Sequence, residues 1–296
     1  MASILVIGNA AVDIINVVAT YPPEDAEVRA LDQRRVRGGN AATTAVVLAQ
    51  LGHRCAFGGS LADDPDAAVI RDDLARHGVD TGPVHPVPGG KVPTSYVSLS
   101  AATGSRTIVH HRDLPEYPET AFADLDLEAY DCVHFEGRNL EAVRAMLERV
   151  RRQRPGLPCS LEVEKPRPGV EALFPLAEVL FFSRVYAEAN GFDEPGALLA
   201  WARERAPAAQ LVCAWGAAGA AATTPGGEVF TVPASPPARV VDTLGAGDVF
   251  HAGVIDRLAA GRELAEAVAA GVRLAGRKCG QEGFDGLSGP GLTAGR

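Results

Sequence analysis

The sequence contains few cysteines, and their spacing shows no pairing pattern. Five cysteines are spread over 296 residues, and no two form a Cys-x-x-Cys motif. An odd number without such spacing argues against both a disulfide framework and a cysteine zinc site. A reducing compartment suits this usage, so we expect a cytoplasmic protein.

Long apolar runs and an excess of positive charge are also missing. No stretch approaches the about 20 apolar residues that span a bilayer, and the N-terminus lacks a basic leader with a cleavage site. Lys and Arg number 28 against 37 Asp and Glu, which leaves a net charge of -9. Such a charge repels nucleic-acid backbones and anionic lipids, so we expect neither as a partner. A few backbone amides and placed cations can still bind a small phosphate-bearing anion.

Short apolar runs alternate with helical stretches along most of the chain. This rhythm predicts an α/β fold with a mainly parallel sheet covered by helices on both faces. The predicted strands are 3–8, 131–137, 159–164, 178–183 and 210–215, and helices are expected after Asn40, over 66–78 and near 139–153, 169–177 and 194–206.

Two segments do not follow this rhythm. Residues 14–36 are rich in β-branched side chains, and residues 92–111 resemble a hairpin that turns at Gly104. We expect both to form a small β lid, and the remaining α/β core to comprise 1–13, 37–91 and 112–287. The glycine-rich residues 288–296 are predicted to be a flexible tail.

The most informative segment is DTLGAGD, residues 242–248. Apolar residues lead into Gly245-Ala246-Gly247, after which Asp248 opens a helix. Glycines at a helix start let consecutive N–H groups point outward, where the helix dipole adds positive charge. The pattern therefore favours an anion-binding site. From these features alone, a plain turn with an Asp cap is the commoner interpretation.

Other phosphate-binding loops are absent. The chain has no G-x-x-x-x-G-K-[ST], and GNAAVD after the first predicted strand is not G-x-G-x-x-G. The missing dinucleotide fingerprint makes hydride transfer a remote alternative.

Two signatures and several shorter stretches carry a family resemblance. DTLGAGD resembles the DTxGAGD signature of the ribokinase-like (PfkB) sugar and nucleoside kinases, and Gly38-Gly39-Asn40 before a helix resembles their other signature. Further stretches resemble the ketohexokinase branch: YPPEDAEVRAL, RGGNAA, SRTIVHH, HFEGRN, EVEKPR, LVCAWG, PPARVVDTLGAGD and KCGQEGFDG. The resemblance implies a ribokinase-like three-layer α/β/α fold with a small β-sheet lid. It also implies ATP-dependent phosphorylation of a ketohexose, with fructose giving fructose 1-phosphate as the leading reaction.

For catalysis, the resemblance implies that Asp248 is the general base. The amides of Gly245, Ala246 and Gly247 would stabilise the developing charge, as preorganised donors do. A carboxylate at a helix N-terminus tends to stay ionised, so we expect Asp248 to be ready to accept the hydroxyl proton.

For sugar recognition, the matching positions are polar residues that can both donate and accept hydrogen bonds. Without the resemblance, Asp13 would be interpreted as a turn residue. For Asp25, a solvated acidic loop remains an open alternative. Thr43 stands where the branch has Asn, and Ser105 likewise replaces an Asn, which leaves room for a different sugar. The implied sugar-binding residues are Asp13, Gly39, Asn40, Thr43 and, across a dimer, Asp25.

For ATP, the resemblance implies a hairpin cation, a pair in EVEKPR, a glycine turn and one cysteine. The alternative for Arg106 is a surface charge, and for Glu164 and Lys165 it is an ordinary strand-end ion pair. The alternative for Cys279 is a buried structural cysteine. The implied nucleotide-binding residues are Arg106, Glu164, Lys165, Gly216, Ala217, Ala218, Gly219 and Cys279.

Mg²⁺ is expected with the nucleotide, held largely by phosphates and waters. The N-x-x-E motif of the wider family is replaced by Ser183-Arg184-Val185-Tyr186, so no metal residue is assigned. The resemblance also implies K⁺ near Asp242 and Thr243.

The expected partners are a small sugar and ATP, together with a second copy of the chain through the β lid. One alternative is a PfkB-family kinase for another sugar, a sugar acid or a nucleoside. A non-catalytic sensor is a further alternative, although the intact Asp248 argues against it.

Overall fold

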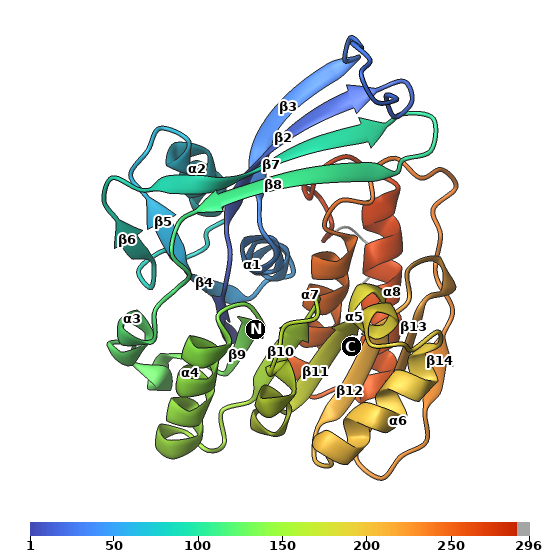
Figure 1. Ribbon diagram of the computed structural model, residues 1–296. Coiled ribbons are helices and arrows are strands. Elements are labelled where there is room, and N and C mark those ends of the chain that lie inside the picture. The colour runs from blue at the N-terminus through green and yellow to red at the C-terminus, as the bar shows by residue number, and fades with distance from the viewer. Residues whose placement is uncertain (289–296) are drawn as a thin grey trace.

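The computed structural model describes residues 1–288, and its centre is an eight-stranded sheet (Figure 1). Neighbouring strands from β4 to β12 are parallel, whereas β13 and β14 are antiparallel additions at one edge. In spatial order the strands are β14 (Phe230–Val232), β13 (Ala220–Thr223), β12 (Gln210–Ala214), β11 (Val179–Ser183), β10 (Cys159–Val163), β9 (Cys132–Glu136), β1 (Ser3–Ile7) and β4 (Arg54–Gly58).

Helices bury both faces of this sheet. In β1, Ile4 and Val6 enter one apolar core while Leu5 and Ile7 enter the other, as the two-residue period of a strand requires. The first core contains α1 (Asn40–Gln50), α2 (Ala67–Arg76), α7 (Ala246–Ala259) and α8 (Leu264–Cys279); the second contains α3 (Glu119–Ala123), α4 (Leu140–Gln153), the 3₁₀ helix η2 (Val170–Leu176), α5 (Arg184–Ala189) and α6 (Pro195–Arg205). The predicted three-layer α/β/α fold is confirmed.

A separate four-stranded sheet stands over the central one in Figure 1. Its order is β3 (Asp32–Gly38), β2 (Ala11–Val18), β7 (Lys91–Ser100) and β8 (Arg106–Asp113). The parallel pairing of β2 with β7 joins the two segments that the sequence set apart from the α/β rhythm. We expected residues 1–13 to belong to the α/β core. Because β2 begins at Ala11, Asp13 lies in the small sheet instead.

Several short elements were not predicted. A two-stranded sheet pairs β5 (Ser60–Ala62) with β6 (His85–Val87). The stretch near 169–177 is a 3₁₀ helix, with Pro175 inside it. Two further 3₁₀ turns are η1 (Leu127–Ala129) and η3 (Gly216–Ala218). Except for Ser288, the predicted tail lies outside the described residues.

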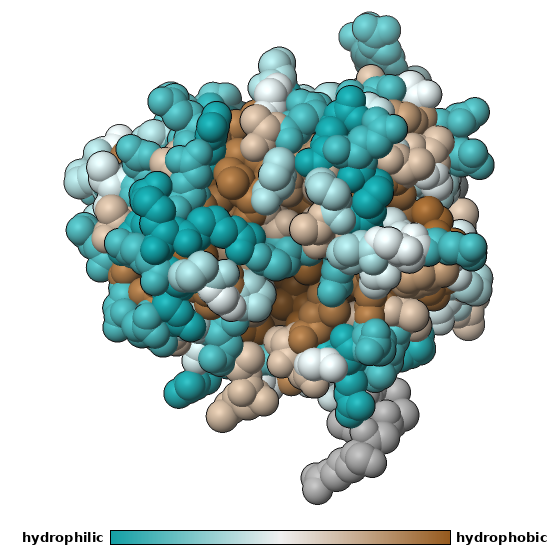
Figure 2. Space-filling model, turned by 90° about the horizontal axis from the view of Figure 1, so that it is seen from below, coloured by the Kyte–Doolittle hydropathy of each residue, from teal (hydrophilic) through white to brown (hydrophobic). Residues whose placement is uncertain are grey.

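All five cysteines are free thiols, as their spacing predicted. Within residues 1–288, no helix combines the length and hydropathy needed to cross a membrane. Figure 2 shows the side away from the small sheet, where hydrophobic residues form a central region bordered by hydrophilic ones.

Candidate active site

A cleft of about 330 Å³ lies between the small sheet and the carboxyl ends of the central strands. Strands β10, β11 and β12 supply its floor and the small sheet its opposite wall, while α1 and α7 begin at its edge. The predicted site residues that line it are Asp13, Gly39, Asn40, Thr43, Arg106, Glu164, Lys165, Gly245, Ala246, Gly247 and Asp248. Residues far apart in the chain therefore meet in one cavity.

The start of α7 provides outward-facing donors. Gly245 caps the helix at φ 71°, a left-handed conformation that favours glycine, and a Cβ there would lie 2.6 Å from the ring of Phe284. The Ala246 N–H donates to Thr243 O at 3.3 Å. Among residues 1–288, the N–H groups of Gly245 and Gly247 have no backbone acceptor. Two of the three predicted amides are thus available to a ligand.

Asp248 lies in the first turn of α7 and is 8% exposed. Burial raises its pKa well above the usual value, and the carboxylates of Glu164 and Glu136 raise the pKa further, whereas Arg37 lowers it. Burial and the neighbouring carboxylates therefore oppose the helix N-terminus, which we expected to favour the ionised form. Desolvation and like charges outweigh the helix dipole here.

Asp13 faces the cleft from β2, close against the backbone of β3. A Cβ at Gly38 would overlap the Asp13 carboxylate, so this close approach needs glycine. Burial raises the pKa of Asp13, while a hydrogen bond from Ser95 and the charge of Arg37 lower it. The carboxylate is thus held at the cleft wall by its surroundings.

Asn40 and Thr43 begin α1 and contact different polar partners. Asn40 Nδ2 donates to Glu162 Oε1 at 3.1 Å and to Glu164 Oε2 at 3.4 Å. Thr43 is 2% exposed, and its Oγ1 accepts a hydrogen bond from Arg37 Nη1 at 2.8 Å. The Thr43 hydroxyl oxygen therefore already accepts one hydrogen bond from within the protein.

The predicted nucleotide cations line the cleft as exposed side chains. Arg106 Nη1 donates to Thr243 Oγ1 at 3.1 Å, which links β8 to the segment before α7. Lys165 Nζ lies 3.8 Å from Glu164 Oε1, so the strand-end ion pair that we considered as an alternative is present. Both residues nevertheless face the cavity.

The remaining predicted residues do not line this cleft. Asp25 lies exposed in the loop between β2 and β3 with φ 60°. Gly216–Gly219 form the turn after β12, whose last residue, Ala214, does line the cleft. Cys279 ends α8, and its carbonyl oxygen accepts the N–H groups of Val241 and Asp242 at 2.8 and 3.3 Å.

The cation expected near Asp242 has a competitor from the chain itself. Lys278 is fully buried, and its Nζ lies 3.0 Å from Asp242 O and 3.1 Å from Asp242 Oδ2. The Asp242 carbonyl, one of the backbone oxygens implied for K⁺, is engaged by this ammonium, so Asp242 does not fit a potassium ion in this arrangement.

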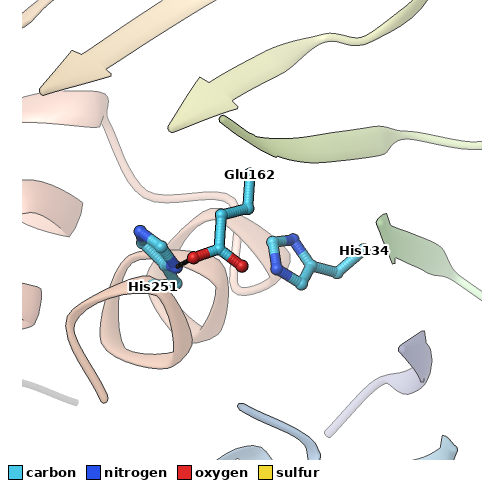
Figure 3. A group of neighbouring side chains, drawn as sticks. All are labelled: His134, Glu162 and His251. Atoms are coloured by element: carbon cyan, nitrogen blue, oxygen red, sulfur yellow. Dashed lines mark ion pairs between the residues drawn. The ribbon is translucent and has the colours of Figure 1, made fainter. Parts of the chain in front are cut away.

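Sequence reasoning missed a set of buried charged and imidazole groups under the cleft. Figure 3 shows three of them pointing toward one another: His134 from β9, Glu162 from β10 and His251 from α7. Glu136, at the end of β9, accepts the Asn9 N–H at 2.7 Å. The available signal was a charged residue ending an apolar strand, in HFEG and in EVEK.

Comparison with known proteins identifies the family. The pfkB family of carbohydrate kinases matches residues 1–287. The chain belongs to that family. It is 41% identical over 292 residues to ketohexokinase from Mus musculus, covering 96% of this chain and 98% of that protein. The chain is therefore an ATP-dependent sugar kinase.

Solved structures agree on the fold. Ribokinase from Giardia lamblia superposes with a TM-score of 0.84 at 16% identity, covering 98% of this chain and 96% of the other. Ribokinase from Cryptococcus neoformans var. grubii serotype A in complex with ADP gives 0.76 at 21% identity, covering 96% of each chain. At these identities the similarity establishes the ribokinase fold alone.

Proposed function

We propose that this kinase transfers the γ-phosphoryl group of ATP to the 1-hydroxyl of fructose, with Asp248 as general base. The observation that carries the proposal is one cleft in which Asp248 faces the same cavity as Asp13 and Asn40. The 41% identity to a ketohexokinase over 96% of the chain supports fructose as the acceptor.

The proposed step exchanges one oxygen–phosphorus bond for another. The hydroxyl oxygen of fructose bonds to the γ-phosphorus, the bond from that phosphorus to the bridging oxygen of ADP breaks, and the hydroxyl proton passes to Asp248. The raised pKa of Asp248 suits this role, because a base works best when its pKa lies near the operating pH. The N–H groups of Gly245 and Gly247 are placed to donate to the phosphoryl oxygens.

Asp13 and Asn40 are proposed to bind the sugar hydroxyls. Asp13 offers acceptors, and the Asn40 amide offers both a donor and an acceptor. Gly39 lets the backbone approach the sugar, and Thr43 borders the same wall. Because Arg37 already donates to the Thr43 hydroxyl, we assign Thr43 a positioning role.

We place the ATP phosphates between the start of α7 and the cations Arg106 and Lys165. The adenine end is proposed to lie toward the Gly216–Gly219 turn and Cys279, next to the cleft. Mg²⁺ fits the cleft, since Glu164 offers carboxylate oxygens there and Mg²⁺ prefers oxygen ligands. Bound with the nucleotide, it would neutralise phosphate charge, with Glu164 holding its waters.

The small sheet is proposed to act as a lid and as a dimerisation surface in a cytoplasmic enzyme. Its outer side carries large apolar side chains that are exposed to solvent: Tyr96 is 49% exposed and Val109 is 67% exposed. Exposed apolar side chains of this kind favour a partner surface. The exposed Asp25 would then reach the cleft of the partner subunit.

A coupled ADP-release assay over ketoses, aldoses, sugar acids and nucleosides tests this function. Fructose should give the highest kcat/KM, and phosphorus–proton NMR should place the phosphate on carbon 1. A higher kcat/KM for another acceptor class, or a phosphate on another carbon, would assign a different substrate. Sugar binding without turnover would favour a sensor.

A further inference from the structure

Three ligating side chains converge in the interior beneath the cleft. His134, Glu162 and His251 come from β9, β10 and α7 and are 1%, 4% and 6% exposed (Figure 3). One ligating atom from each lies within 4.8 Å of the others. None of the three roles proposed above, for proton transfer, sugar binding or phosphate binding, uses the two imidazoles.

Each of these residues has a buried polar atom without a partner. His134 Nε2, Glu162 Oε2 and His251 Nδ1 form no hydrogen bond within the described chain, and His251 Nδ1 lies 3.8 Å from Glu162 Oε1. Burying an unsatisfied polar atom costs free energy, and native structures rarely leave one without a partner. Three such atoms, on side chains that point toward one another, indicate one ligand that all of them share.

Outer hydrogen bonds hold two of the three groups in place. Ser160 Oγ lies 2.8 Å from His134 Nδ1, which leaves Nε2 directed at the cluster. Asn40 Nδ2 donates to Glu162 Oε1 at 3.1 Å, which leaves Oε2 free. Partners of this kind orient metal-binding imidazoles and carboxylates and set their affinity.

The donor set selects the kind of ligand. Two of the three donors are imidazole nitrogens and the third is a carboxylate oxygen. Neutral imidazole is a ligand for Zn²⁺ and similar transition metals, whereas Mg²⁺ and Ca²⁺ prefer an all-oxygen set. A metal cation would also neutralise the carboxylate, whereas a phosphate group is an anion that the carboxylate would repel.

We propose that His134, Glu162 and His251 form a binding site for one transition-metal ion, with Zn²⁺ as the probe. Metal–ligand bonds of about 2.0–2.2 Å would draw the three ligating atoms closer together. Glu162 and His251 line the cleft, so the metal can enter from it and a water can complete the coordination. His251 lies three residues after Asp248 on α7, which places this ion beside the catalytic cleft.

The test uses the full chain, freed of metal with a chelator and titrated with Co²⁺ and then Zn²⁺. We expect one Co²⁺ per chain with the visible absorption of a low-coordinate site, displaced by one Zn²⁺. His134→Gln and His251→Asn should each weaken binding at least about 10-fold, since each removes a ligand. His111→Asn, which changes an exposed histidine on β8, should bind as the unchanged protein does.

Circular dichroism of the metal-free variants establishes that they are folded. If either ligand variant does not fold, Ser160→Ala keeps all three ligands and removes only the outer hydrogen bond to His134; we expect it to bind roughly 10-fold more weakly or worse. The proposal is overturned if the unchanged protein does not bind the metal stoichiometrically. It is also overturned if the substituted proteins bind the metal with the same affinity as the unchanged protein. These readouts need no turnover, so they stand apart from the proposed sugar reaction.

Discussion

Replacing Asp248 with Asn removes the proposed base while keeping the shape of the side chain. General-base assistance is worth about 100-fold to 10,000-fold. At about 1.36 kcal/mol per tenfold, this corresponds to roughly 2.7–5.4 kcal/mol of transition-state stabilisation. We therefore expect Asp248→Asn to lower kcat for fructose by at least about 100-fold.

The surroundings of Asp248 indicate that the loss will be confined to the chemical step. Glu164 and Glu136 both raise the pKa of Asp248, so a neutral amide relieves repulsion rather than creating an unpaired charge. The carboxamide occupies the same space, so no cavity forms. We expect an unchanged or higher free energy of unfolding and a KM for fructose within about threefold of the original.

The assay is coupled ADP release at saturating ATP, run beside urea unfolding of the same preparations. Asp256→Asn is a matched control, because Asp256 lies on the same helix but outside the cleft. Its kcat should equal that of the unchanged enzyme. A kcat for Asp248→Asn within threefold of the unchanged enzyme would refute the assignment of the base.

Three further changes test other parts of the site. Lys278→Met leaves the buried Asp242 carboxylate unpaired and should cost about 3–5 kcal/mol in urea unfolding, with a loss under about 1 kcal/mol contradicting that pairing. In the unchanged enzyme, replacing K⁺ with N-methylglucamine should leave kcat unaltered, and strong dependence on K⁺ would show that the ammonium does not take its place. Gly38→Ala should push the Asp13 carboxylate aside and raise the KM for fructose about tenfold or more with a smaller effect on kcat; an unchanged KM would remove Asp13 from sugar binding. Val109→Asp should turn a dimer into a monomer in light scattering, whereas a monomeric unchanged enzyme would contradict the dimer.

The layers of the fold could be predicted because their signals are local. An apolar strand such as β1 buries both faces, and its alternation with helices dictates a parallel sheet. The glycines that precede α1 and α7 likewise indicated where the polar residues of the cleft would lie. By contrast, the edge strands β13 and β14 were missed, because an alanine-rich or three-residue strand has little β propensity of its own.

The chemistry inside the site depends on tertiary contacts that no local pattern contains. The raised pKa of Asp248 comes from burial and from carboxylates of distant strands, which outweigh the helix start that the sequence does show. The ammonium of Lys278 meets Asp242 across 36 positions in the chain. His134 and His251 stand apart in sequence, and only the packing of α7 on the sheet brings them to Glu162.

The most direct test of proton transfer to Asp248 is the pH dependence of kcat/KM for fructose, measured side by side in the unchanged enzyme and in Asp248→Asn. Because the base acts only when deprotonated, the unchanged enzyme should lose activity as the pH falls through the Asp248 pKa, which burial places above the ordinary aspartate range. The residual activity of Asp248→Asn should lack this acid limb. The same acid limb in both proteins would contradict the mechanism.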